Sequence, residues 1–193
     1  MSTPRIPRAQ ITGPYGRLLT AYARRAWGQV PDNASVLWHN RPVLRSVFGF
    51  ERSLAKWDRL DRHLRTYAVM ASAATVGCSW CLDFGYFLAH TDGLDEAKVR
   101  QVPRWRESDV FTPLERRVMA YAEAMTTTPL TVTDEMDGEL VAELGPAAVV
   151  ELTEMVAVEN QRSRFNAAVG LTSQGFSSAC ALPLAEPAAA AAP

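Results

Sequence analysis

The chain is poor in several features that would mark a secreted, membrane or nucleic-acid-binding protein. Its 193 residues include only three cysteines, no uninterrupted apolar run approaches spanning length, and residues 1–7 lack the apolar core of a signal peptide. Twenty basic and 21 acidic side chains give a net charge of −1, and no basic run is interleaved with stackable aromatics. We therefore expect a cytoplasmic protein with neither a nucleic-acid nor a membrane partner.

The few cysteines also exclude a secreted disulfide framework. Cys78 and Cys81 form a C-x-x-C pair, which in a reducing compartment is more often catalytic or metal-binding than structural. No second C-x-x-C or H-x-x-x-H could complete a zinc site, so we expect neither a metal nor another cofactor. The remaining Cys180 lies near the C-terminus and is interpreted as an incidental thiol.

The composition predicts one all-α domain of about eight helices. Hydrophobic residues make up 48% of the chain and charged residues 21%, and no stretch has the alternation of a strand. We expect an extended N-terminal arm over 1–14, a helical domain over 15–178, and a disordered Ala/Pro-rich tail over 179–193.

Local signals place several helices and one connector. Thr112-Pro113-Leu114-Glu115 is a capping box with proline at the first helical position, which predicts a helix from residue 113 to about 125. Periodicity and helix-end residues predict further helices over 34–46 with an interruption near 40–42, over 48–57, over 58–75 and over 146–171, and an exposed connector over 102–109.

The cysteine pair lies where one helix ends and another begins. Gly77 reads as the C-cap of the preceding apolar helix, and the new helix begins at the cysteines. Unpaired N–H groups and the positive end of the helix dipole would then favour thiolate over thiol. Residues at i and i+3 lie close enough for a disulfide, so the pair can cycle between dithiol and disulfide and could reduce a peroxide or another disulfide.

At this point the sequence resembles the carboxymuconolactone decarboxylase superfamily, in particular the AhpD-like alkylhydroperoxidases and their peroxidase-related relatives. The resemblance is carried by four stretches, residues 64–69, 77–85, 112–116 and 159–168. It implies an AhpD-like multi-helix bundle that forms a homo-oligomer and reduces hydroperoxides. It further implies that a dithiol or lipoyl-type protein supplies the electrons.

The full motif of that family has a glutamate twelve residues before the first cysteine and a histidine four residues after the second. This chain has Thr66 and Gly85 at those positions, so the group that activates the thiol differs. On a helical wheel Asp83 and His90 point away from the face of Cys81. Asp83 so near the pair would raise a thiol pKa, and its simpler interpretation is a solvated or interhelical hydrogen-bonding residue.

Three further residues are candidates for a supporting role. Trp80, between the cysteines, could shield them or stack against a substrate. Glu159 and Asn160, with Arg164 one turn later, could lock helices together through hydrogen bonds and ion pairs, or could form a polar wall beside the cysteines that replaces the missing proton relay.

The candidate catalytic residues are thus Cys78 and Cys81, and the possible supporting residues are Thr66, Trp80, Asp83, Glu159 and Asn160. Helix-end geometry favours Cys78 as the thiolate, whereas the resemblance implies Cys81. Three functions stay open: a thiol peroxidase or oxidoreductase, a non-redox lyase, isomerase or biosynthetic enzyme on the same scaffold, and an oligomeric module with a structural or sensing disulfide.

Overall fold

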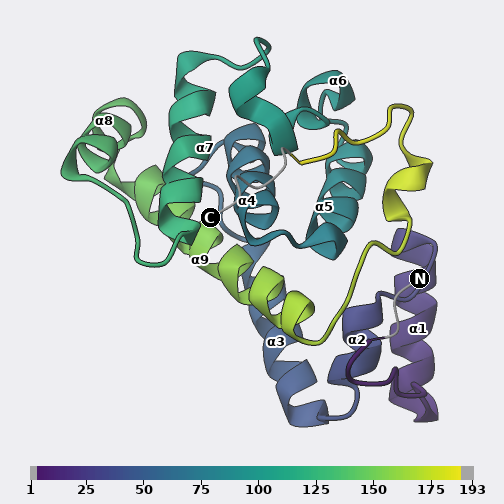
Figure 1. Ribbon diagram of the computed structural model, residues 1–193. Coiled ribbons are helices and arrows are strands. Elements are labelled where there is room, and N and C mark those ends of the chain that lie inside the picture. The colour runs from purple at the N-terminus through teal and green to yellow at the C-terminus, as the bar shows by residue number, and fades with distance from the viewer. Residues whose placement is uncertain (1–3, 188–193) are drawn as a thin grey trace.

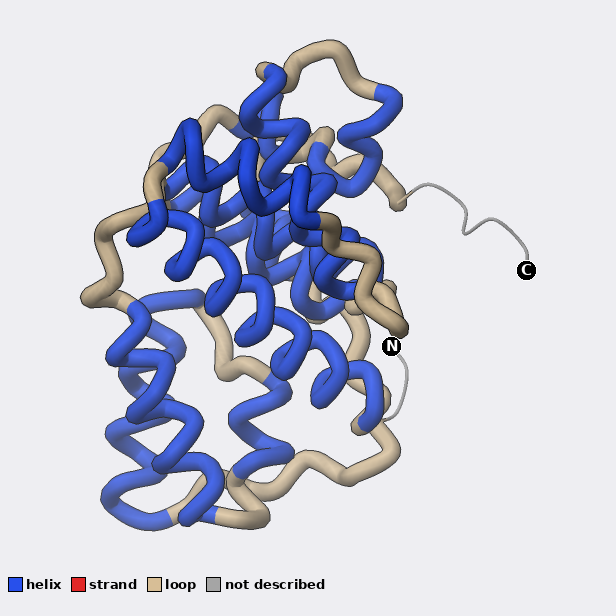
Figure 2. The backbone as a smooth tube through the Cα atoms, turned by 90° about the vertical axis from the view of Figure 1, so that its left-hand side faces the viewer, coloured by secondary structure: helices blue, strands red, loops and turns tan. Residues whose placement is uncertain are grey.

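The computed structural model describes residues 4–187, and in that range the protein is built from helices without a strand (Figures 1 and 2). The elements are α1 (Gly13–Trp27), α2 (Asp32–Leu37), α3 (Arg41–Leu54), α4 (Arg62–Val76), α5 (Ser79–Thr91), α6 (Glu96–Val99), the 3-10 helix η1 (Val102–Glu107), α7 (Pro113–Thr126), α8 (Asp134–Leu144), α9 (Pro146–Ala168) and the 3-10 helix η2 (Phe176–Ala179). The predicted all-α fold class, a multi-helix bundle, is confirmed.

Helix α4 is the centre of the bundle. It packs against α7 and α9 on one side and against α5 on the other (Figure 1). Its buried face is rich in small residues, namely Ala68, Ala71, Ser72 and Ala73. Small side chains let neighbouring helices approach closely, so the sequence of α4 explains why three helices can pack on it.

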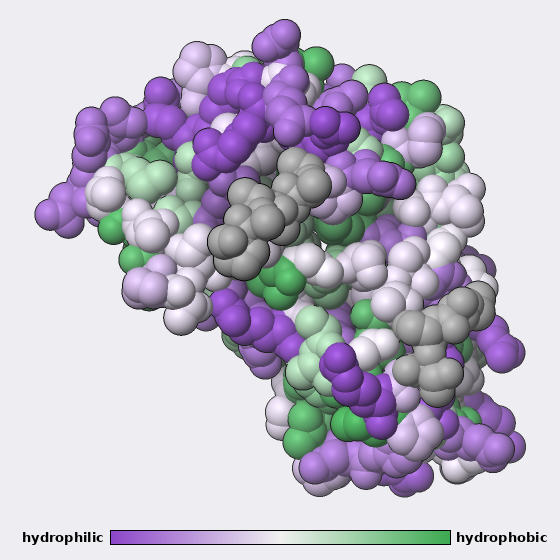
Figure 3. Space-filling view, viewed as in Figure 1, coloured by the Kyte–Doolittle hydropathy of each residue, from purple (hydrophilic) through white to green (hydrophobic). Residues whose placement is uncertain are grey.

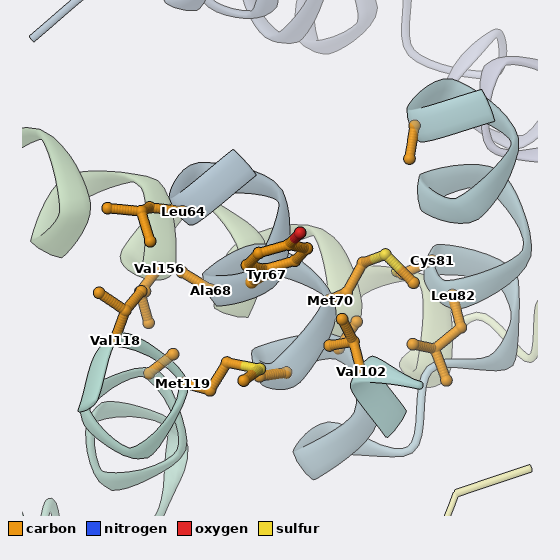
Figure 4. Close-up of a cluster of buried hydrophobic side chains, with 14 of the residues drawn as sticks. Leu64, Tyr67, Ala68, Met70, Cys81, Leu82, Val102, Val118, Met119 and Val156 are labelled. Atoms are coloured by element: carbon orange, nitrogen blue, oxygen red, sulfur yellow. The ribbon is translucent and has the colours of Figure 1, made fainter. Parts of the chain in front are cut away.

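The core that surrounds α4 is apolar and continuous (Figure 4). Tyr67 and Met70 of α4 are fully buried, as are Met119 of α7 and Val156 of α9. Helix α9 runs 23 residues, which corresponds to about 34 Å at 1.5 Å per residue, so it spans the whole bundle. One end of α9 therefore lies against α7 and α8 while the other reaches α5.

The helix ends confirm most of the local signals. Thr112 and Glu115 form the predicted capping box, with the two reciprocal bonds at 3.3 and 2.7 Å. Gly77 ends α4 with φ of 77°, the left-handed conformation that glycine adopts without strain. The chain is thereby turned directly into the cysteine helix.

The prediction of separate helices over 34–46 and 48–57 is wrong. The chain breaks at Trp38–Asn40, and α3 continues without interruption from Arg41 to Leu54. Pro42 lies in the first turn of α3, where its missing N–H removes no helical hydrogen bond, and the Asn40 side chain accepts from the N–H of Val43 at 3.4 Å. The proline therefore starts a helix instead of interrupting one.

The prediction of an exposed connector over 102–109 is also wrong. Residues 102–107 form η1, in which Val102 and Trp105 are buried against α4 and α7. The Trp105 indole donates to a carboxylate oxygen of Glu123 at 2.6 Å. Two large apolar side chains in a short segment are more stable buried than solvated, which outweighs the polar residues around them.

Both ends of the described chain lie on the helical body. The Arg5 N–H donates to the Val169 carbonyl at 2.8 Å, and Arg8 forms an ion pair with Asp32 at 2.5 Å. At the other end the N–H groups of Ala181 and Leu182 donate to one carboxylate oxygen of Glu96 at 2.9 and 3.1 Å. The first part of the predicted disordered tail is therefore hydrogen-bonded to the body, and residues 188–193 lie outside the described residues.

The surface shows no single large apolar face in the view of Figure 3, where apolar residues form small patches among hydrophilic ones. The most exposed large apolar side chains, Leu18, Leu130 and Val150, come from different elements. Among the helices of residues 4–187, none combines the length and the apolar character that crossing a membrane requires.

Candidate active site

The C-x-x-C pair forms a disulfide at the turn from α4 into α5. Cys78 and Cys81 are joined with their Cα atoms 5.3 Å apart. Cys78 is the N-cap residue of α5, and its sulfur accepts the backbone N–H of Cys81 at 3.2 Å. The sulfur therefore takes one of the N–H groups that the first turn of a helix leaves unpaired, as the sequence predicts.

The two cysteines differ in accessibility. Cys78 is 2% exposed and Cys81 is 9% exposed, so both lie under the surface but Cys81 is nearer to it.

Asn166, on the last turns of α9, is the polar side chain that touches the disulfide. Its amide nitrogen Nδ2 lies 3.3 Å from Sγ of Cys81 and donates to it, and the residue is only 1% exposed. The amide oxygen Oδ1 is buried and makes no hydrogen bond within the described protein. A buried carbonyl oxygen without a partner is unusual, since burial of a polar group is unfavourable unless it is hydrogen-bonded.

Sequence reasoning missed Asn166 as a site residue. The signal was present, because Glu159, Ser163 and Asn166 follow one another at spacings of four and three on a helix. These buried polar residues continue the face of α9 that carries Leu152 and Val156. A polar group at the end of an apolar stripe indicates a specific partner in the core.

The two positions where the motif departs from its family pattern hold no acid or base. The Thr66 hydroxyl donates to the Arg62 carbonyl of its own helix at 2.9 Å. A Cβ atom built on Gly85 would lie 3.5 Å from Cγ of Met70, in ordinary van der Waals contact. Met70 of α4 thus packs beside Gly85 of α5, and the close-up of the core shows the Met70 side chain directed toward Cys81 (Figure 4). An apolar methionine, one turn after Thr66, therefore packs against the position of the family's histidine.

Asp83, predicted to point away from the sulfurs, is an anchor for the segment that follows α9. It is 2% exposed, and its carboxylate accepts the four consecutive N–H groups of residues 174–177 at 2.7 to 3.1 Å. Burial by itself raises the pKa of Asp83, but the hydrogen bonds from Ser177, Gln174 and Phe176 outweigh it and hold that pKa below its usual range. The carboxylate is therefore not solvated, and its partners come from the loop before η2 and from the first two residues of η2.

The segment that Asp83 anchors also contacts the first turn of the cysteine helix. The side-chain oxygen of Gln174 accepts from the Trp80 indole at 3.3 Å, and the Ser173 N–H donates to the Ser79 hydroxyl at 3.3 Å. The Trp80 ring packs on Phe84 with centroids 5.1 Å apart and on Phe176 at 6.2 Å. Of the two predicted roles for Trp80, these contacts favour packing that shields the cysteines.

Glu159 and Asn160 lie in a network away from the disulfide. The Glu159 carboxylate accepts from Ser163 at 2.7 Å and from Arg162 at 3.4 Å, and burial raises its pKa to about 7. The Asn160 amide donates to hydroxyls of α4 and α7. Glu159 precedes Asn166 by seven residues, or about 10 Å along the helix axis. The contacts fit the network that locks helices together, and they do not join Glu159 to the sulfurs.

Three other polar or titratable side chains lie on or near α5 and take no part in the contacts of the disulfide. The buried Tyr86 hydroxyl donates to the Leu182 carbonyl at 2.8 Å. His90 pairs with the Glu96 carboxylate. Cys180 is half-buried, and burial together with nearby carboxylates raises the pKa of its thiol to about 11.

Within residues 4–187 no three His, Cys, Asp or Glu side chains gather as a metal ion would require. The groups that the structure brings together at this site are the two sulfurs and the amide beside them.

Comparison with known proteins gives one family and one fold. The family model described as carboxymuconolactone decarboxylase matches residues 42–124. The uncharacterized protein YnjA of Escherichia coli (strain K12) is 31% identical over 170 residues, which cover 88% of this chain and 85% of that protein.

Two solved structures have the same fold over almost their whole length. An uncharacterized peroxidase-related protein with an alkylhydroperoxidase AhpD core, from Ralstonia eutropha JMP134, superposes with a TM-score of 0.79 at 16% identity, covering 91% of this chain and 95% of that one. The debrominase Bmp8, in a complex of a cysteine-to-alanine variant with 2,3,4-tribromopyrrole, has a TM-score of 0.78 at 19% identity, covering 90% and 94%.

Proposed function

This chain belongs to the carboxymuconolactone decarboxylase family, in its AhpD-like branch, and we propose from that membership that it reduces hydroperoxides with the Cys78–Cys81 dithiol. The observation that supports the proposal best is the disulfide itself. It lies at a helix start, with an N–H group directed at one sulfur and an amide directed at the other. Such surroundings favour the thiolate, which is the nucleophile in thiol chemistry.

The reaction has two steps that balance. The Cys81 thiolate attacks the terminal oxygen of the hydroperoxide, the O–O bond breaks, a sulfenic acid forms and the alkoxide leaves, taking the proton that the thiol had released. The Cys78 thiol then attacks the sulfenic sulfur, water leaves, and the disulfide forms. One hydroperoxide becomes one alcohol and one water, and the dithiol loses two electrons.

We assign the attack to Cys81 because it is the more exposed cysteine and because Asn166 donates to its sulfur. Cys78 is buried, and its sulfur accepts the Cys81 N–H in the first turn of α5. A buried sulfur in a fixed position suits the resolving thiol. The proposal thereby follows the family resemblance, which implies Cys81, and not helix-end geometry, which favours Cys78.

The disulfide must be reduced again after each turnover. We include in the proposal a dithiol or lipoyl-type protein as electron donor, a homo-oligomeric assembly, and a cytoplasmic location, where a reductant of this class is available. The reaction on this chain needs no bound cofactor, because both electrons that reduce each hydroperoxide come from the two thiols.

Stopped-flow oxidation of the reduced protein by hydrogen peroxide and by an organic hydroperoxide tests the proposal. One equivalent of either oxidant should be consumed for each intramolecular disulfide that forms. The reaction should be faster than the oxidation of free cysteine at the same pH. Cys81→Ser should abolish the reaction, and Cys180→Ser, at a thiol outside the site, is the matched control. Oxidation no faster than that of free cysteine would contradict the proposal.

The likeness to the debrominase favours a second candidate, the reductive removal of a halogen from a halogenated aromatic compound. The Cys81 thiolate would take the bromine, the ring carbon would gain a proton, and Cys78 would displace bromide to form the same disulfide. Incubation of the reduced protein with 2,3,4-tribromopyrrole should then release bromide in proportion to disulfide. If the protein converts a substrate without forming the disulfide, and the Cys81→Ser variant converts it equally well, a non-redox lyase or isomerase is favoured instead.

A further inference from the structure

The contacts of Asn166 assign it a catalytic role at the Cys81 sulfur. We propose that its Nδ2 holds Cys81 as a thiolate, and that its unpartnered Oδ1 accepts a hydrogen bond from the hydroxyl of the sulfenic acid that forms on Cys81. The role of Asn166 in peroxide reduction rests on the proposed function, whereas its effect on the thiol does not depend on any substrate.

The first observation is the direction of the hydrogen bond. Nδ2 lies 3.3 Å from Sγ of Cys81 in the oxidised protein, where a disulfide sulfur can only accept. A thiolate is also only an acceptor, and a hydrogen bond to a charged group is stronger than one to a neutral group. Asn166 therefore favours the thiolate over the thiol in the orientation that the structure shows.

The second observation is the free oxygen on the same amide. Oδ1 of Asn166 is buried without a partner in the described protein, although the whole residue is 1% exposed. The other groups that could serve the sulfur are absent at the expected positions, because Thr66 is bonded within its own helix and Gly85 packs against Met70. The S–O–H group of a sulfenic acid at Cys81 would find its hydrogen-bond acceptor in Oδ1 after a rotation of the amide.

An amide can therefore hydrogen-bond the sulfur group in successive states of the reaction, although it transfers no proton itself. Nδ2 donates to the disulfide and to the thiolate, and Oδ1 accepts from the hydroxyl of the sulfenic acid. The unfavourable burial of Oδ1 in the oxidised protein is then relieved while the sulfenic acid is present.

The thiol pKa of Cys81 is the quantity to measure, in a background of Cys78→Ser and Cys180→Ser so that one thiol remains. The rate of iodoacetamide alkylation is followed against pH. In Asn166→Leu and in Asn166→Ala we expect the pKa to rise by about one to two units, which lowers the thiolate fraction about ten-fold or more at a pH below the pKa.

Asn160→Ala is the matched control, since it removes the same amide from the same helix where that amide donates to hydroxyls of α4 and α7. It should leave the pKa of Cys81 unchanged. A rise in only one of the two Asn166 variants would indicate an effect of volume and would overturn the assignment, as would no rise in either.

A measurement on the unsubstituted residue covers the case in which a variant does not fold. In the reduced protein with Asn166 intact, the side-chain ¹⁵N resonance of Asn166 should shift with pH. The midpoint of that shift should equal the Cys81 pKa obtained from the alkylation rates, and a resonance that does not move overturns the assignment. If the resonance and the variants behave as expected while peroxide is not reduced, the proposed function fails and the role of Asn166 at the sulfur stands.

Discussion

Replacing Asp83 with asparagine should destabilise the protein by about 2–4 kcal/mol at pH 7. One carboxylate oxygen accepts three N–H groups of residues 174–177 and the other accepts the fourth. Asparagine can turn its oxygen toward the three donors, but its NH₂ group then faces the fourth N–H and loses that bond. A hydrogen bond to a charged group contributes about 1.5–3 kcal/mol and one to a neutral group about 0.5–1.5 kcal/mol.

The estimate follows from these contributions. The lost bond costs about 2 kcal/mol and each of the three weakened bonds about 1 kcal/mol. The smaller cost of burying a neutral amide in place of a carboxylate offsets part of that sum. The amides of residues 174–177 should also exchange with solvent faster, because they lose their charged acceptor.

The pH dependence gives a separate check on the same residue. The pKa of Asp83 is lowered in the folded protein, so its stabilising contribution is complete above the unfolded carboxyl pKa of about 3.9 and is lost as the pH falls through the folded value. The stability difference between Asp83→Asn and the unsubstituted protein should therefore be largest at neutral pH and shrink in acid.

Urea unfolding at several pH values measures this difference. Asp61→Asn is the matched control, because the exposed Asp61 carboxylate also accepts backbone N–H groups, at 2.8 and 3.2 Å, but asparagine is an equally good N-cap. A loss below 0.5 kcal/mol in Asp83→Asn, or a loss equal to that of the control, would refute the reasoning from the four hydrogen bonds.

The other predictions concern the thiols and the buried glutamate. Cys78→Ser should let the Cys81 sulfenic acid accumulate, detected by mass spectrometry after one equivalent of peroxide; a Cys81 that stays reduced in this variant would contradict the order of attack. Cys180 should react with iodoacetamide much more slowly than free cysteine at pH 8, because its pKa is raised to about 11, and equal rates would contradict that burial. Glu159 binds a proton up to a pH of about 7 when folded but only up to about 4.3 when unfolded, so the unsubstituted protein should lose stability relative to Glu159→Gln as the pH rises from 5 to 8. A difference in unfolding free energy between the two proteins that does not change over this pH range would contradict the raised pKa. The rate of Cys81 alkylation should be the same in both proteins.

Much of the fold could be predicted because its signals are local. The capping box at Thr112 and the helix end at Gly77 each act through neighbours within one or two turns, and each holds in the structure. One error came where a tertiary contact competes with a local preference, since Trp105 is buried by α4 and α7 although the residues around it are polar. The error at Pro42 was local, because a proline in the first turn starts a helix and does not interrupt it.

The candidate site divides in the same way. The disulfide joins two residues one turn apart, so the sequence by itself determined that Cys78 and Cys81 could form it and that α5 would begin there. Only the tertiary structure decided which groups surround the sulfurs, because Asn166 is 85 residues from Cys81 along the chain and the partners of Asp83 are at least 91 residues away. A hydrogen bond between such distant residues depends on how α9 crosses the bundle, and the spacing of residues within a helix carries no information about that crossing.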